Sequence, residues 1–112
     1  MNRARANALG LPEATEADHH GIASFRVRGK IFATVPDDRH MRIMLDENGI
    51  RSAIAEFPSV CQERYWGEKL ACVVVAVEAA TTGLLRELLG DAYRRKAPVS
   101  LAGQIDKAER RH

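Results

Sequence analysis

The feature that most constrains the fold is a run of three strand-like segments separated by turns too short to hold a helix. Residues 23–28 alternate apolar and basic side chains, and Gly29 separates them from a second strand-like segment, residues 30–35. Residues 36–38, Pro-Asp-Asp, supply another turn before residues 40–45. Strands joined by such short turns pair in the antiparallel sense, so this run predicts a three-stranded meander.

The register of the first hairpin stays open by one residue. It decides whether Lys30 or Ile31 shares a face of the sheet with Val27.

The rest of the chain predicts three helices, a second hairpin and polar connections. Helices are expected over residues 3–9, from the N-cap Asp46 to Pro58, and from Thr81 or Thr82 to about residue 97. Two strands, residues 60–66 and 70–77, are expected to form a hairpin around the turn Gly67-Glu68-Lys69. Residues 13–21 are polar and predict a loop. The order α-β-β-β-α-β-β-α indicates an α+β two-layer sandwich, with an antiparallel sheet covered on one face by helices. We expect one domain over residues 1–98, followed by a charged C-terminal tail over residues 99–112.

Length and composition exclude several classes of protein. A chain of 112 residues has the size of one domain. Its longest apolar run, residues 71–77, is far shorter than a membrane-spanning helix. The N-terminal residues resemble no secretory signal, so a cytoplasmic protein is expected. Cys61 and Cys72 are then expected to be reduced thiols in the core rather than a disulfide.

The net charge of +2 is too small to require a polyanionic partner, but it is unevenly distributed. Residues 1–30 carry +2, residues 31–81 carry −3 and residues 82–112 carry +3. Any argument for nucleic-acid binding must therefore rest on local clusters of basic residues.

No catalytic, metal or cofactor motif stands out. His19 and His20 are adjacent, so in an extended chain their side chains point apart, and nothing in the sequence brings His40 or His112 to them. The serines lack the GxSxG elbow, and no glycine-rich phosphate loop occurs. We therefore predict a protein that is not an enzyme, with no catalytic residues, no metal and no cofactor.

The basic residues of the two hairpins are the candidate binding residues. Arg26, Arg28 and Lys30 lie within five residues at one hairpin tip, Arg64 lies on the second hairpin, and Lys69 lies at its tip. A hairpin tip can approach a groove of DNA while its cations contact phosphates. The competing interpretation is that such charges keep strand edges soluble and unpaired.

Two other features have ordinary structural explanations. The segment Arg94-Arg95-Lys96 at a helix C-terminus is explained by the helix dipole. The six aromatic residues suggest no stacking platform, and Trp66 is expected to pack its indole over the edge of the core.

Four stretches occur in order along the chain: Ala8-Leu9-Gly10-Leu11-Pro12-Glu13, Ser24-Phe25-Arg26-Val27-Arg28-Gly29-Lys30-Ile31-Phe32-Ala33, Trp66-Gly67, and Asp91-Ala92-Tyr93-Arg94-Arg95-Lys96-Ala97-Pro98. In this order they resemble the MmcQ/YjbR family of small bacterial proteins, over about residues 4–102. The resemblance implies an α-β3-α-β2-α sandwich similar to the fold of secretion chaperones. It also implies double-stranded DNA as the partner, bound by hairpins that act as a double wing.

Two other functions stay open. A chaperone-like protein-interaction module, either monomeric or homodimeric, would show a contiguous exposed apolar patch. A small-molecule site would show a deep pocket near His19, His20 or Trp66. The DNA assignment fails for this surface if the variant Arg26→Ala/Arg28→Ala/Lys30→Ala binds as well as the wild type.

Overall fold

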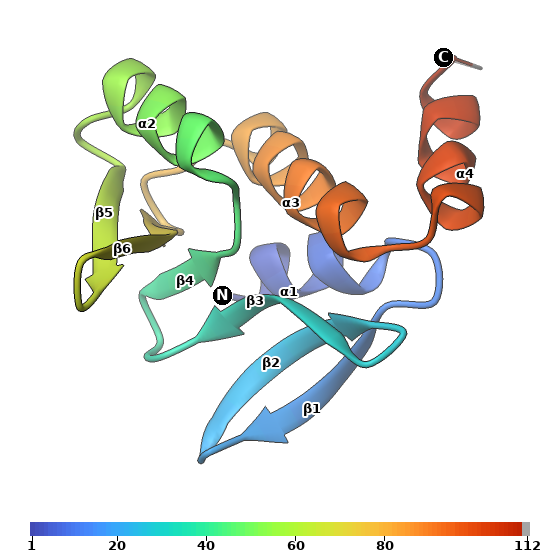
Figure 1. Ribbon diagram of the computed structural model, residues 1–112, viewed down its shortest axis with the longest axis horizontal. Helices are drawn as coiled ribbons and strands as arrows, with labels where there is room; N and C mark the ends of the chain where they lie inside the picture. The colour runs from blue at the N-terminus through green and yellow to red at the C-terminus, as the bar shows by residue number, and fades with distance from the viewer. Residues whose placement is uncertain (111–112) are drawn as a thin grey trace.

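The computed structural model describes the backbone of residues 1–110 and the side chains of residues 1–105, and its α+β fold with an antiparallel sheet confirms the predicted class (Figure 1). In chain order the elements are α1 (Asn2–Leu9), β1 (Thr15–His19), β2 (Ile22–Val27), β3 (Lys30–Val35), β4 (His40–Ile43), α2 (Glu47–Glu56), β5 (Cys61–Trp66), β6 (Lys69–Ala76), α3 (Thr82–Lys96) and α4 (Val99–Arg110). None of the described helices has the length and apolar character needed to cross a bilayer.

The six strands form one sheet in the order β1-β2-β3-β4-β6-β5, and all neighbours are antiparallel. Helix α3 packs on β3, helix α2 packs on β5 and β6, and helix α1 packs on α3. Figure 1 shows α2 and α3 over the same face of the sheet. This arrangement gives the predicted two layers.

The register of the first hairpin is now settled, because Val27 pairs with Lys30. The turn consists of Arg28 and Gly29, both with positive φ (51° and 78°), as the tight hairpin turns that match strand twist require. Gly29 takes this conformation freely, whereas Arg28 is strained in it.

Strand β1 corrects the prediction of a loop over residues 13–21. Its sequence, Thr-Glu-Ala-Asp-His, shows no apolar alternation. β1 is an edge strand, and four of its five residues are exposed. Such a strand is held by the backbone ladder to β2, from Thr15 opposite Arg26 to His19 opposite Ile22. Hydropathy carries little information about an edge strand of this kind.

Helix α4 lies within the stretch expected to be a charged C-terminal tail, where no helix was predicted. Leu101 and Ile105, four residues apart, are buried, and α4 packs against α3. Residues 111 and 112 of the predicted tail lie outside the described part of the chain.

A bulge between β2 and β3 brings two consecutive side chains into the core. Phe25 pairs with Ala33 and Arg26 pairs with Ile31, so Phe32 is the extra residue. Both Phe32 and Ala33 are fully buried. The core between the layers also contains Met41, Ile43, Val73, Val75, Leu85, Leu89 and Tyr93.

The two cysteines are free and buried on opposite faces of the sheet. Cys61 pairs with Val75, whereas Cys72 lies three positions away on β6 and pairs with Arg64. Alternate residues of a strand face opposite sides, so these thiols cannot approach each other. Burial raises the pKa of both thiols.

Candidate functional site

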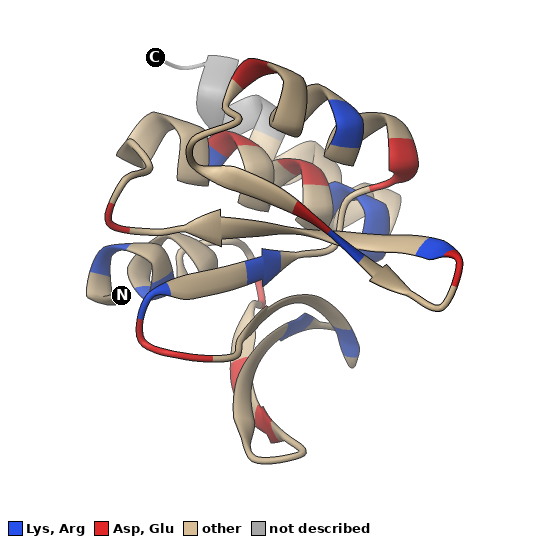
Figure 2. Cartoon of the chain, turned by 90° about the vertical axis from the view of Figure 1, so that its left-hand side faces the viewer, with Lys and Arg blue, Asp and Glu red and all other residues tan. Residues whose placement is uncertain are grey.

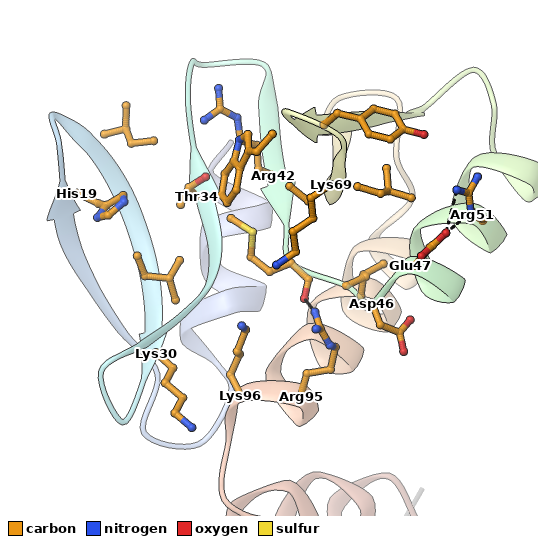
Figure 3. A pocket seen from close by; sticks show the side chains of 18 of the residues that line it. His19, Lys30, Thr34, Arg42, Asp46, Glu47, Arg51, Lys69, Arg95 and Lys96 are labelled. Carbon is orange, nitrogen blue, oxygen red and sulfur yellow. Dashed lines mark hydrogen bonds and ion pairs between the residues drawn. The ribbon is translucent and has the colours of Figure 1, made fainter.

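A notch at one end of the sheet separates the tips of two hairpins, β2–β3 and β5–β6, because the strand β4 between them is short. Ile43, the last residue of β4, pairs with Ala33 on one side and with Val73 on the other. The chain then leaves the sheet toward α2, whereas β3 begins at Lys30 and β6 begins at Lys69. Both hairpins therefore extend past β4 at the same end of the sheet. The space between them is a recess of about 810 Å³ (Figure 3).

Four cations from three segments line this notch, and we call them the basic cluster: Lys30, Lys69, Arg95 and Lys96. Lys30 and Lys69 come from the two hairpins, and the other two from the last turn of α3. Burial, and then repulsion from the other three cations, lowers the pKa of the Lys96 ammonium below that of an ordinary lysine. Figure 3 shows Lys69 and Lys96 reaching into the notch from opposite sides.

Arg95 connects the end of α3 to the segment that follows β4. Its Nη1 donates a hydrogen bond of 2.7 Å to the carbonyl oxygen of Met44, where the chain leaves the sheet. Hydrogen bonds from a charged donor are among the stronger ones. This bond holds Arg95 and its neighbour Lys96 beside the hairpin tips.

Positive charge exceeds negative charge in the notch. Six Lys and Arg residues line it with three Asp and Glu residues, a formal excess of +3 in a chain whose total is +2. Two of the carboxylates are engaged, since Asp46 accepts a 2.7 Å hydrogen bond from the Gly49 backbone N and Glu47 pairs with Arg51 at 2.9 Å. Within the described residues, the three lysines of the basic cluster form no ion pair.

One wall of the notch contains a buried hydroxyl that lacks a partner. Thr34 is only 4% exposed, and its Oγ1 forms no hydrogen bond within the described structure. Its cross-strand neighbours are Ser24, whose hydroxyl donates to the Ala17 carbonyl oxygen at 2.8 Å, and Arg42, which also lines the notch. Buried polar groups are nearly always hydrogen-bonded, so an unpartnered one at a recess suggests a place for a ligand.

Two exposed aromatic side chains also line the notch. Trp66 is 54% exposed and Tyr65 is 45% exposed, which corrects the expectation that the Trp66 indole packs over the core edge. Trp66 pairs directly with Lys69 across the β5–β6 hairpin. An aromatic ring and a lysine of the basic cluster are therefore cross-strand neighbours.

The structure brings only two of the five sequence-predicted binding residues into the notch, Lys30 and Lys69. Arg26 is part-buried and donates from Nε to the Ser24 hydroxyl at 3.0 Å. Arg28 forms two hydrogen bonds to the Glu13 carboxylate, at 2.9 and 3.0 Å, and this pairing lowers the pKa of Glu13. Arg64 lies on the edge strand β5, opposite Cys72 of β6.

Three further cations of the notch, Arg95, Lys96 and Arg42, were not predicted as binding residues from the sequence. The helix dipole explains a basic last turn equally well, so Arg95 and Lys96 gave no separate signal. Figure 2 shows basic and acidic residues mixed along the elements, so only the folded arrangement identifies the cluster.

The notch meets part of the requirement for a small-molecule site, because His19 and Trp66 line it. Its sides are open, however, and no hydrogen-bonded pair of nucleophile and base lines it within the described residues. The described side chains also contain no group of three His, Cys, Asp or Glu residues that could hold a metal ion.

Comparison with known proteins identifies one family. A family model described as YjbR matches residues 9–95, which include both hairpins and nearly all of α3. No curated protein and no solved structure matches the chain.

Proposed function

The chain belongs to the YjbR family, and from this premise we propose that it is a small cytoplasmic DNA-binding protein that holds phosphates with the basic cluster. The observation that carries the proposal is the meeting of four cations, from two hairpin tips and one helix end, at a single notch. Like charges held together repel one another, and a phosphate between them would relieve that repulsion.

The geometry suits contact with the backbone of double-stranded DNA. Lys30 and Lys69 lie on hairpins that extend from the same end of the sheet, so both can approach one ligand. Phosphate contacts position a protein on DNA without reading its sequence. The roles of Arg26, Arg28 and Arg64 remain predictions, and the Glu13 carboxylate already neutralises much of the charge of Arg28.

Two further observations agree with this proposal. The free, buried thiols are typical of a reducing compartment such as the cytoplasm. The alternative of a protein-interaction module needs a contiguous apolar patch, but the exposed residues Leu9, Phe57 and Val99 lie on or beside different helices. The other two large apolar residues that are exposed in the described part of the chain, Tyr65 and Trp66, are adjacent, but they line the notch together with its cations. We therefore favour DNA binding, without catalysis, over a protein-interaction role.

The salt dependence of binding tests the proposal. We expect wild-type protein to bind a fluorescently labelled DNA duplex with an affinity that falls as salt rises, with a log–log slope of about −3 to −4 for four phosphate contacts. Fluorescence anisotropy at several salt concentrations measures this slope. Absence of binding at low salt, or binding that is insensitive to salt, would contradict the proposal.

A further inference from the structure

We infer that the notch takes an unpaired base of DNA, with Trp66 stacking on the base while the basic cluster holds the adjoining phosphates, so that single-stranded DNA binds more tightly than duplex. The inference rests on the proposed function, because it assigns the same notch. It adds the strand form of the DNA and a role for the aromatic wall.

The first support is the pairing of an aromatic ring with a cation. Proteins that bind single strands combine a positively charged groove with aromatic side chains on which bases stack. Trp66 is 54% exposed and is the cross-strand neighbour of Lys69. A base on the indole would therefore lie beside a cation that can hold its phosphate.

The second support is the size and shape of the recess. The recess is open at its sides, and its volume of about 810 Å³ falls within the usual range of sites for one small ligand. In an intact DNA duplex the bases are paired and stacked, so none of them is free to enter the recess. A paired base would first have to unpair and leave its stack, which costs free energy. An unpaired base in a single strand avoids the cost of unpairing.

The third support is the unpartnered hydroxyl of Thr34. It lies 96% buried at the notch, and no described group satisfies it. A base carries hydrogen-bond donors and acceptors along its edge, whereas a bare apolar ligand carries none. Charge, stacking surface and a free polar group therefore meet at one recess, as a nucleotide unit requires.

The test compares three ligands on wild-type protein: an oligothymidylate of about ten nucleotides, a duplex of the same length, and thymidine monophosphate. We expect the single strand to bind more tightly than the duplex. Trp66 is the only tryptophan of the chain, so its fluorescence reports stacking directly. Quenching by the single strand, and much weaker quenching by the duplex, is the expected result.

Variants separate stacking from charge. Trp66→Ala should lower single-strand affinity by roughly 5- to 100-fold and leave duplex affinity unchanged, whereas Trp66→Phe should retain most of the single-strand affinity. Thr34→Val, which keeps the shape of the side chain, should lower single-strand affinity by about 2- to 10-fold. Phe57→Ala, at an exposed ring outside the notch, is the matched control and should change neither affinity.

Each outcome decides a different claim. Trp66→Ala could bind the single strand as well as the wild type does, or could lose as much affinity for the duplex as for the single strand. Either result would show that Trp66 does not stack on a base, and would leave the proposal of phosphate binding unaffected. If thymidine monophosphate competes as well as the oligonucleotide, a free nucleotide is the ligand and the strand claim is wrong. If neither DNA form binds, the proposed function itself fails.

Discussion

Replacing Tyr93 by alanine is expected to lower the free energy of unfolding by about 3–5 kcal/mol, a large share of the total for a domain of this size. The Tyr93 ring is fully buried and meets Phe32 edge-on, with the ring centres 5.8 Å apart. Its hydroxyl donates a 2.7 Å hydrogen bond to the carbonyl oxygen of Pro12. The substitution removes the packing of α3 on β3 together with a link to the α1–β1 connection. Urea unfolding followed by circular dichroism measures the loss.

Tyr93→Phe is the matched control. It keeps the ring and removes only the hydrogen bond to Pro12, so we expect a loss of about 1 kcal/mol. A loss below about 1 kcal/mol for Tyr93→Ala would show that the ring does not fix α3 to the sheet. Tyr93 lies two and three positions before Arg95 and Lys96, so the same contacts hold the helix end beside the hairpin tips.

The second large effect is a loss of affinity for duplex DNA, which we expect in the variant Lys30→Gln/Lys69→Gln/Lys96→Gln. Each lysine that contacts a phosphate contributes about 0.9 to the salt slope, so the slope should become shallower by roughly 2.7. Over the tenfold salt range from 1 M to 0.1 M, this corresponds to a loss of about 500-fold in duplex affinity at the lower salt. Anisotropy titrations of wild type and variant measure both quantities.

A second triple variant controls for net charge. Arg5→Gln/Arg39→Gln/Arg86→Gln also removes three positive charges, but none of these residues lines the notch. We expect a loss of only a few-fold, through the general field of the protein. Equal losses in the two triple variants would mean that overall charge, rather than the basic cluster, governs binding.

Local sequence signals predicted much of the fold because they act within a few residues. Asp46 and Thr81 accept hydrogen bonds from the Gly49 and Leu84 backbone N–H groups, so Asp46 is the predicted N-cap and Thr81 is the N-cap of the two candidates Thr81 and Thr82. Gly29 has the positive φ of a hairpin turn. Such preferences are fixed by backbone geometry and do not depend on the rest of the chain.

Strand β1 and helix α4 were not predicted, because they depend on contacts with other elements that the local sequence pattern does not encode. Strand β1 is held by its ladder to β2 and has little apolar surface of its own. Helix α4 has only Leu101 and Ile105 buried among its described side chains, and its sequence becomes charged directly after Ile105. In both cases the stabilising partner is another element of the fold.

The site was predictable only in part. The hairpin tips identified Lys30 and Lys69, because turn positions can be read from sequence. The contribution of α3 and the unpartnered Thr34 hydroxyl depend on where β4 ends and on how the helix crosses the sheet. No spacing rule encodes that crossing.

The most direct test of the central claim is to follow the lysine side chains by NMR while duplex DNA is added. The signals of Lys30, Lys69 and Lys96 should shift together and saturate at the same DNA concentration. The pKa of Lys96, lowered in the free protein by burial and neighbouring cations, should rise on binding because phosphate favours the charged ammonium. Since the bound form then holds its proton more tightly, affinity should fall as pH rises through the free-state pKa of Lys96. Saturable binding with these three signals unmoved, and shifts on another surface, would contradict the account.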